Sequence, residues 1–206
     1  MPEPSQCFRS RFAARITTPR LVLRPLEMAD AKPMAALIGP EVARMTGSFC
    51  VPYLSLTGEF FILRQPSLER RGLGHHWAIL HNGVFAGAIG VVRPSVQSDW
   101  EIGYWLGEPF WSRGIASEAV LAVLAEFRSN LPDAELWARV FTDNPASRRV
   151  LEKAGWRVTG TEMGHCMERQ CDVEGWRLRG PFAGNGVPRH QRRPRMAHQA
   201  MEEALG

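Results

Sequence analysis

The stretch "WEIGYWLGEPFWSRGIASEAV" (residues 100–120) decides the fold, because a strand pattern runs through one short turn directly into a helix pattern. In "WEIGYWL" (100–106) the side chains alternate, which predicts a strand with Glu101, Gly103 and Trp105 on one face. After the turn, apolar residues recur at helical spacing on one face: Val120, Val123, Leu124 and Phe127. The predicted helix stops near Asn130.

The turn between the two elements combines small residues with one arginine. A helix N-terminus leaves several backbone N–H groups unpaired and carries a partial positive charge, so residues 113–117 offer donors to an anion. Gly114 and Ala116 keep the approach open, and Arg113 adds charge outside the loop. These features predict a diphosphate site. On these residues alone, tight packing of the helix start against its strand explains the pattern equally well.

The remaining sequence alternates strand and helix patterns. His81-Asn82-Gly83 between two apolar runs predicts a hairpin, and Asn144 followed by Pro145 predicts a capped helix that ends at Gly155. Further strands are expected at 20–26, 135–141 and 173–180. Further helices are expected at 27–39 and at about 56–69, the second interrupted by Pro66. Hairpins mixed with crossovers indicate a mixed α/β domain.

Length and composition are those of one globular domain. The chain has 206 residues, of which 45% are hydrophobic and 22% charged, and it contains no apolar run long enough for a membrane helix or a secretory signal. Its four cysteines form no CxxC pair, so reduced thiols and a cytoplasmic location are expected.

The charge distribution argues against nucleic acid as a partner. The net charge is +4, but residues 1–24 carry +4 and residues 181–206 carry +2, which leaves −2 for residues 25–180. We therefore expect a flexible N-terminus at 1–15, one domain at 16–180, and a basic tail rich in Gly, Pro and Arg at 181–206.

Four stretches together resemble one family: "TPRLVLRPLEMADA" (18–31), the following hairpin, "WEIGYWLGEPFWSRGIASEAV" (100–120) and "NPASRRVLEKAGW" (144–156). They are similar to the GNAT superfamily of N-acetyltransferases, in the branch of RimJ and RimL. The wider superfamily favours Gln or Arg where Trp111 stands, and this branch commonly has an aromatic residue there. The resemblance implies a GNAT fold, a mostly antiparallel splayed sheet flanked by helices.

The resemblance also implies a cofactor site for acetyl-CoA and an amine acceptor. Acetyl-CoA would lie where the sheet splays, with its pantetheine arm against the backbone of Trp105 and Leu106. Its diphosphate would lie on the amides of Ser112, Arg113, Gly114, Ile115, Ala116 and Ser117. Asn144 would bind the cofactor arm, and Ser147 would face the thioester sulfur. From the residues alone, Asn144 is equally interpreted as a helix cap.

The chemistry requires a base, because an amine attacks a thioester only when it is neutral. Glu101 is the candidate by its place in the family pattern, and an exposed strand glutamate is the alternative. The backbone N–H near Leu106 would bind the oxyanion, and Ser147 would assist departure of the thiolate. No metal is expected at "GHCMERQC" (164–171), which is interpreted as a hairpin turn, and His75 and His76 are interpreted as structural.

The predicted activity is therefore transfer of an acetyl group from acetyl-CoA to a primary amine. A catalytically silent acyl-CoA-binding regulator and a ribosome- or RNA-associated protein stay open as alternatives. The acceptor, whether a protein N-terminus, a small amine or an aminoglycoside, is not fixed by any motif, and a homodimer also stays open.

Overall fold

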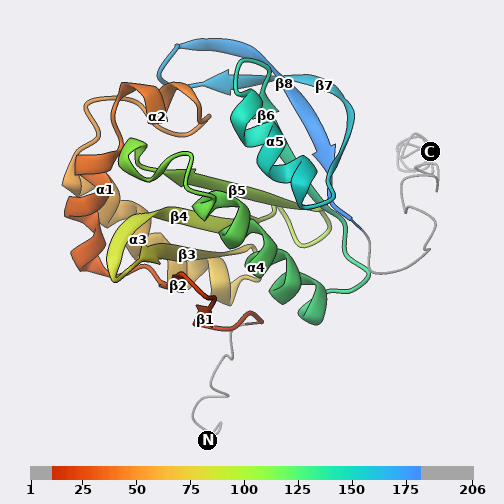
Figure 1. The fold of residues 1–206 in the computed structure, drawn as a ribbon, viewed down its shortest axis with the longest axis horizontal. Helices are drawn as coiled ribbons and strands as arrows, with labels where there is room; N and C mark the ends of the chain where they lie inside the picture. The colour runs from red at the N-terminus through yellow and green to blue at the C-terminus, as the bar shows by residue number, and fades with distance from the viewer. Residues whose placement is uncertain (1–10, 182–206) are drawn as a thin grey trace, which may run out of the picture.

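The computed structural model describes residues 11–181, which form one body of eight strands with helices on both faces (Figure 1). The strands are β1 (Ile16–Thr17), β2 (Leu21–Pro25), β3 (Gly74–His81), β4 (Val84–Val92), β5 (Trp100–Leu106), β6 (Leu136–Phe141), β7 (Arg157–Cys166) and β8 (Cys171–Arg179). The helices are η1 (Met28–Asp30), α1 (Ala31–Leu37), α2 (Pro40–Arg44), α3 (Ser55–Arg70), η2 (Glu108–Phe110), α4 (Ile115–Asn130) and α5 (Pro145–Lys153).

The strands form one sheet in the order β1-β2-β3-β4-β5-β6-β8-β7. All neighbouring strands are antiparallel except β5 and β6, which are parallel. These two pair only where Trp100 lies opposite Leu136 and Glu101 opposite Trp137, and they diverge beyond that point (Figure 1). The predicted mixed α/β fold with a mostly antiparallel, splayed sheet is confirmed.

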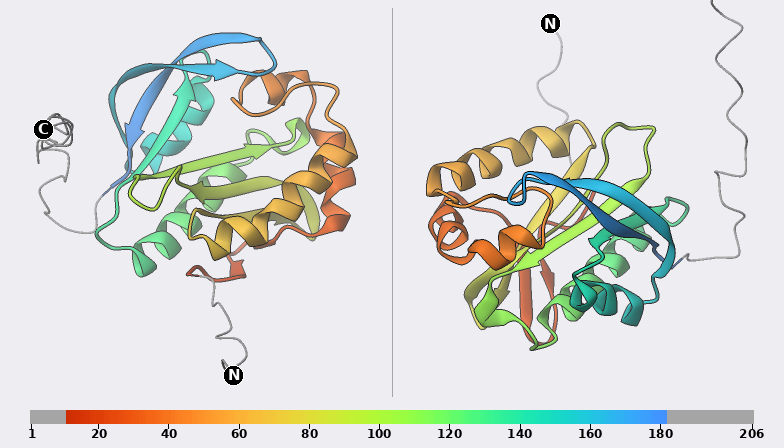
Figure 2. Two further views of the ribbon diagram at one scale, coloured as in Figure 1. Left: turned by 180° about the vertical axis from the view of Figure 1, so that it is seen from behind. Right: turned by 90° about the horizontal axis from the view of Figure 1, so that it is seen from above.

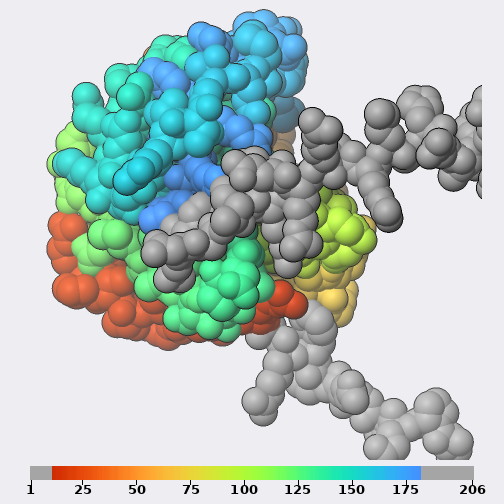
Figure 3. Space-filling view, turned by 90° about the vertical axis from the view of Figure 1, so that its right-hand side faces the viewer, coloured from red at the N-terminus to blue at the C-terminus, as the bar shows by residue number. Residues whose placement is uncertain are grey.

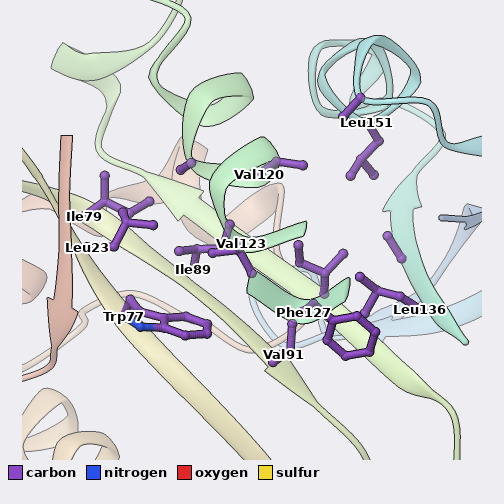
Figure 4. Close-up of a cluster of buried hydrophobic side chains, with 14 of the residues drawn as sticks. Leu23, Trp77, Ile79, Ile89, Val91, Val120, Val123, Phe127, Leu136 and Leu151 are labelled. Carbon is purple, nitrogen blue, oxygen red and sulfur yellow. The ribbon is translucent and has the colours of Figure 1, made fainter. Parts of the chain in front are cut away.

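One face of the sheet is covered by α4 and α5 and holds the larger hydrophobic core (Figure 4). The α4 side chains point between the two halves of the sheet, as its apolar spacing predicts: Val120, Val123 and Phe127 are fully buried. From β5, Trp100 and Ile102 join this cluster. The core therefore continues across the short pairing of β5 with β6.

The opposite face carries α1 and α3, which lie in front of the sheet when the molecule is seen from behind (Figure 2). A second cluster of apolar side chains fills this side and includes Met34, Ile62 and Trp105. The alternation predicted for β5 is confirmed, because Trp105 and Ile102 belong to different clusters. Among residues 11–181, no helix is long and apolar enough to cross a membrane.

Two tight backbone features agree with the sequence patterns. Asn82 and Gly83 have φ values of 51° and 77°, the left-handed pair that a two-residue hairpin turn requires. Gly155 has a φ of 88° just after α5, where a helix C-terminus favours glycine.

Pro66 does not interrupt α3, so the predicted break is wrong. The helix is continuous from Ser55 to Arg70 and contains the proline. Its position is set by packing: a Cβ at Gly58 would lie 3.2 Å from the Cα of Ala31, so α3 lies very close to α1. Tertiary contacts on this side of the sheet outweigh the one helical hydrogen bond that a proline removes.

Residues 12 and 13, which lie at the end of the segment expected to be flexible, pack against the domain. Phe12 is 6% exposed and makes ring contacts with Trp77, Trp100 and Phe127. The carbonyl of Ala13 accepts a hydrogen bond from the Trp77 indole at 3.0 Å. In the space-filling view the beginning of the described chain (red) lies against α4 (green) (Figure 3). Residues 1–10 and most of the predicted basic tail, 182–206, lie outside the described residues.

We predict that Phe12→Ala lowers the free energy of unfolding by about 3 kcal/mol or more, because it leaves a cavity among the rings of His75, Trp77, Trp100 and Phe127. Phe60→Ala is the matched control, since Phe60 is 61% exposed on α3 and its truncation should be nearly neutral. Urea denaturation of the two variants measures the difference. Equal stabilities would contradict the place of Phe12 in the core.

Candidate active site

A cavity of about 790 Å³ opens where β5 and β6 diverge. It is lined by all but one of the residues predicted for the site: Glu101, Trp105, Leu106, Ser112, Gly114, Ile115, Ala116, Ser117, Asn144 and Ser147. Arg113 is not among the lining residues, and its backbone carbonyl accepts a hydrogen bond from Arg20 Nη1 at 2.9 Å. The fold thus brings the ends of β5, α4 and α5 together at one opening.

The turn before α4 is shaped to expose backbone N–H groups. Gly114 occupies the N-cap position in a left-handed conformation, with φ of 75°, and no side chain caps the helix. Ser112 also has a positive φ, of 59°. Residues just before β2 hold the first turn of α4 in place. Glu118 of this turn accepts hydrogen bonds from Thr18 Oγ1 at 2.6 Å and from the Arg20 backbone N–H at 3.0 Å.

The start of α5 contributes Asn144 and Ser147. As predicted for a helix cap, Oδ1 of Asn144 accepts a hydrogen bond from the Ser147 backbone N–H at 3.1 Å. This cap uses the side-chain oxygen of Asn144, so the cap and a contact from its NH₂ group to a ligand are compatible.

Tyr104 lies beside Ser147, and the sequence interpretation did not include it. Its hydroxyl is 2.8 Å from Ser147 Oγ and donates to the Ser147 carbonyl at 3.1 Å. Burial raises the pKa of Tyr104 to about 12, and the hydrogen bond with Ser147 opposes this shift. The phenol is therefore neutral near pH 7 and is a hydrogen-bond donor. The sequence did offer one indication of this position: in the strand "WEIGYWL", Tyr104 lies on the face opposite Glu101.

Glu101 lies at the last residue pair before β5 and β6 diverge. Burial raises the pKa of Glu101, Glu162 adds to the increase, and Arg139 and Arg177 oppose it. The side chain is half-buried, which differs from a fully solvated strand glutamate. A carboxylate with a raised pKa is better matched to accept a proton near neutral pH.

Glu101 and Ser147 reach the cavity from opposite sides of the sheet. Glu101 shares the face of Trp105, toward α1 and α3, whereas Ser147 and Tyr104 lie on the side of α5. An extended molecule that passes between β5 and β6 would meet both groups.

The segment from residue 20 to residue 157 matches the family described as "Acetyltransferase (GNAT) domain". The chain belongs to the GNAT acetyltransferase family. A curated relative, the uncharacterized N-acetyltransferase YoaA of Bacillus subtilis (strain 168), is 32% identical over 153 residues, which cover 70% of this chain and 84% of YoaA.

Solved GNAT structures have the same fold. The microcin C7 self-immunity acetyltransferase MccE, in complex with acetyl-CoA and AMP, has a TM-score of 0.71 at 15% identity and covers 80% of this chain and 94% of its own. RimL, the ribosomal L7/L12 alpha-N-protein acetyltransferase in complex with coenzyme A, has a TM-score of 0.64 at 20% identity, with 78% and 94% covered. The resemblance to GNAT enzymes is confirmed, and these neighbours are consistent with the RimJ and RimL branch.

Of the two histidines at the start of β3, His75 is buried and His76 is partly buried. Burial lowers the pKa of both His75 and His76 to about 4, so both are neutral at pH 7. His75 Nδ1 lies 2.9 Å from Glu69 Oε1, and His76 lines the cavity with its ring edge against Phe61. In the described part of the chain, no group of three or more His, Cys, Asp and Glu residues is arranged to hold a metal ion.

The stretch at 164–171 forms the β7–β8 hairpin, as predicted. Cys166 lies opposite Cys171 in this hairpin, and both are free thiols, as is Cys50. His165 Nδ1 lies 3.1 Å from Asp172 Oδ1 on the exposed side of the same hairpin.

We predict that Tyr104 titrates near pH 12 in the folded protein, well above the ordinary value of about 10, because burial disfavours the phenolate. Absorbance titration of the wild type and of Tyr104→Phe isolates its signal, since the chain has two tyrosines. Tyr53→Phe is the matched control and should leave the component near pH 12 in place. A Tyr104 signal at about pH 10 in folded protein would contradict the hydrogen-bonded, buried position.

Proposed function

We propose that this GNAT acetyltransferase transfers an acetyl group from acetyl-CoA to a primary amine by direct attack within a ternary complex. The observation that carries the proposal is the opening between β5 and β6, with Glu101 on one face and the Ser147–Tyr104 pair on the other. A thioester between these groups would have a base on the acceptor side and hydroxyl donors on the sulfur side.

We assign the cofactor to the α4 side of the opening. The diphosphate would lie on the uncapped backbone amides of residues 112–117, with Gly114 keeping the approach open and Arg113 adding positive charge at the rim. The pantetheine arm would follow the edge of β5 at Trp105 and Leu106, which β6 does not pair with there. The Asn144 side-chain NH₂ would donate to the arm. MccE and RimL, whose structures contain acetyl-CoA and coenzyme A, support acetyl-CoA as the co-substrate.

Glu101 is the group that we propose as the base that accepts a proton from the amine. An acceptor bound as an ammonium loses one proton before its neutral nitrogen bonds to the acetyl carbon; the carbon–sulfur bond then breaks, and the second proton lost from nitrogen balances protonation of the coenzyme A thiolate. Glu101, directly or through one water, would take the first of these protons. Its raised pKa makes it a stronger base than an ordinary glutamate, while Arg139 and Arg177 limit that rise.

The leaving thiolate and the oxyanion need donors. Ser147 Oγ would donate to the sulfur when the neutral Tyr104 phenol turns its single proton from the Ser147 carbonyl to Ser147 Oγ, 2.8 Å away. The backbone N–H near Leu106 would stabilise the oxyanion. The Leu106 carbonyl accepts a hydrogen bond from the Trp111 indole at 2.7 Å, which fixes the backbone at this point.

Two kinds of primary amine are candidates for the acceptor. RimL acts on a protein α-amine, so a protein N-terminus is one candidate, and a small-molecule amine is the other. A cytoplasmic location and a homodimeric assembly stay predictions from the sequence and the family.

The proposed activity is tested by thiol release from acetyl-CoA with a panel of peptides, amino acids and small amines. We expect amine-dependent release of coenzyme A and a matching mass increase of one acceptor. Tight acetyl-CoA binding with no acetylated amine in the whole panel would instead favour a catalytically silent regulator.

We predict that Glu101→Gln lowers kcat by about 100-fold with little change in acetyl-CoA affinity, because the amide cannot accept the proton. The loss should shrink as pH rises, since the acceptor then deprotonates without help. Wild-type activity should rise with pH through the raised pKa of Glu101, above the range of an ordinary glutamate. Ser147→Ala should slow turnover less, because water can replace its hydroxyl. A loss that does not depend on pH would assign Glu101 to binding of the charged amine.

We predict that Gly114→Val abolishes measurable acetyl-CoA binding in calorimetry, because valine disfavours a φ of 75° and its branched side chain would crowd the phosphate path. The matched control is Gly83→Val in the β3–β4 turn, where φ is 77° and nothing lies within 4 Å of an added Cβ. The control carries the same backbone strain and should keep its affinity. Unchanged affinity in folded Gly114→Val would reject the diphosphate assignment.

A further inference from the structure

Arg139 lies on the acceptor side of the cavity, on the sheet face that Glu101 shares. It is two residues beyond Trp137, which pairs with Glu101, so its Cα is about 7 Å further along β6. Side chains two residues apart on a strand share a face. Arg139 and Glu101 both line the cavity and interact electrostatically.

The Arg139 side chain packs directly against two glycines of the neighbouring strands. A Cβ at Gly175 of β8 would lie 3.1 Å from Arg139 Cγ, and a Cβ at Gly164 of β7 would lie 2.5 Å from Arg139 Nη1. On the other side, a Cβ at Gly47 would lie 3.8 Å from Nη2. Any larger side chain at Gly164 would displace the guanidinium. The sequence thus keeps space for an arginine that lies flat over two strands.

The guanidinium of Arg139 has no hydrogen-bond or ion-pair partner among residues 11–181. Its neighbour on β8 is different: Arg177, directly opposite Arg139, pairs with Glu162 at 3.1 Å and lies 4.1 Å from the Trp137 ring centroid. Arg139 is partly exposed and the charge of Glu101 acts on it without a hydrogen bond, so its N–H donors stay available to a ligand in the cavity. One of the two arginines is thus satisfied within the protein, and the other faces the cavity with its donors unused.

We propose that the acceptor is a primary amine that also carries a carboxylate, and that Arg139 binds this carboxylate while the amine lies toward Glu101. The guanidinium has a planar fork of N–H donors, which suits a carboxylate. The proposal rests on the proposed acetyltransferase function and names its substrate class. The carboxylate belongs either to a free amino acid or to an acidic side chain near a peptide N-terminus, and the chemistry at Arg139 is the same.

The alternative role for Arg139 is to tune Glu101. The charge of Arg139 does oppose the raised pKa of Glu101. Such tuning would affect every amine acceptor alike, because Glu101 takes a proton from each of them. Recognition of a carboxylate would affect only acceptors that carry one, so the two roles predict different selectivities.

The test compares acceptors that differ only in the carboxylate. One set is free L-amino acids against their carboxamides, and the other is tetrapeptides with Asp against Asn, or Glu against Gln, at the first or second position. The measured quantity is kcat/KM for coenzyme A release, divided by the fraction of neutral amine at the assay pH. We expect at least one carboxylate acceptor to be preferred over its amide by about 10-fold or more, the size of a charge-assisted hydrogen bond.

The preference should depend on Arg139. In Arg139→Met the ratio of the two kcat/KM values should fall to about one, and Arg139→Lys should keep part of it, because lysine retains the charge but not the fork. Arg177→Met is the matched control and should leave the ratio unchanged whatever its effect on the overall rate. The Lys variant and the wild-type ratio remain informative if Arg139→Met does not fold.

Three results separate the outcomes. Amides acetylated as well as their carboxylates overturn the assignment of Arg139 while the acetyltransferase function stands. An unchanged ratio in Arg139→Met overturns it as well. Failure of every amine in folded protein that binds acetyl-CoA overturns the proposed function itself, and the substrate class with it.

Discussion

The whole molecule depends on one short contact, the parallel pairing of β5 with β6. It consists of two residue pairs and the hydrogen bond from the Trp100 N–H to the Glu135 carbonyl at 3.0 Å. Because these strands are parallel, the chain must cross over between them, and α4 provides the crossover. The pairing holds two antiparallel half-sheets together at one end, and their divergence at the other end produces the cavity. A longer pairing would close it.

An opened sheet edge leaves polar groups that must be satisfied in another way. Side chains do part of this: Trp111 donates to the Leu106 carbonyl, and Tyr104 joins β5 to Ser147 across the gap. These residues line the cavity together with the strand ends that they connect. The same opening holds Glu101 half-buried at the end of the pairing, where ionisation is costly. The constraint that creates the cavity therefore also partly buries Glu101 and so raises its pKa.

Local patterns predicted the parts of the structure that depend on local chemistry. The left-handed pair at Asn82 and Gly83, the cap at Asn144 and the exposed amides after Gly114 are all set by residues within one or two turns. Phe12 was missed because its burial depends on rings from three distant elements. Residues 11–15 are too few to show the hydrophobic periodicity that would predict such burial.

No sequence motif predicts the side of the cavity proposed to bind the acceptor, because that side is also formed by contacts between distant segments. Residues 45–49 line the cavity, and their loop is bound to the β7–β8 hairpin: the Met167 N–H donates to the Gly47 carbonyl, and the Val51 N–H donates to the Glu168 carboxylate. Asp143, just before the α5 cap, is tied to the same hairpin by Arg169 at 2.8 Å. Every one of these contacts joins segments about 25 or more residues apart in sequence. The backbone proposed to bind the cofactor takes its shape from a short motif, whereas the acceptor side is lined by side chains that only the assembled fold brings together, so a sequence pattern predicts the first and leaves the second free to vary.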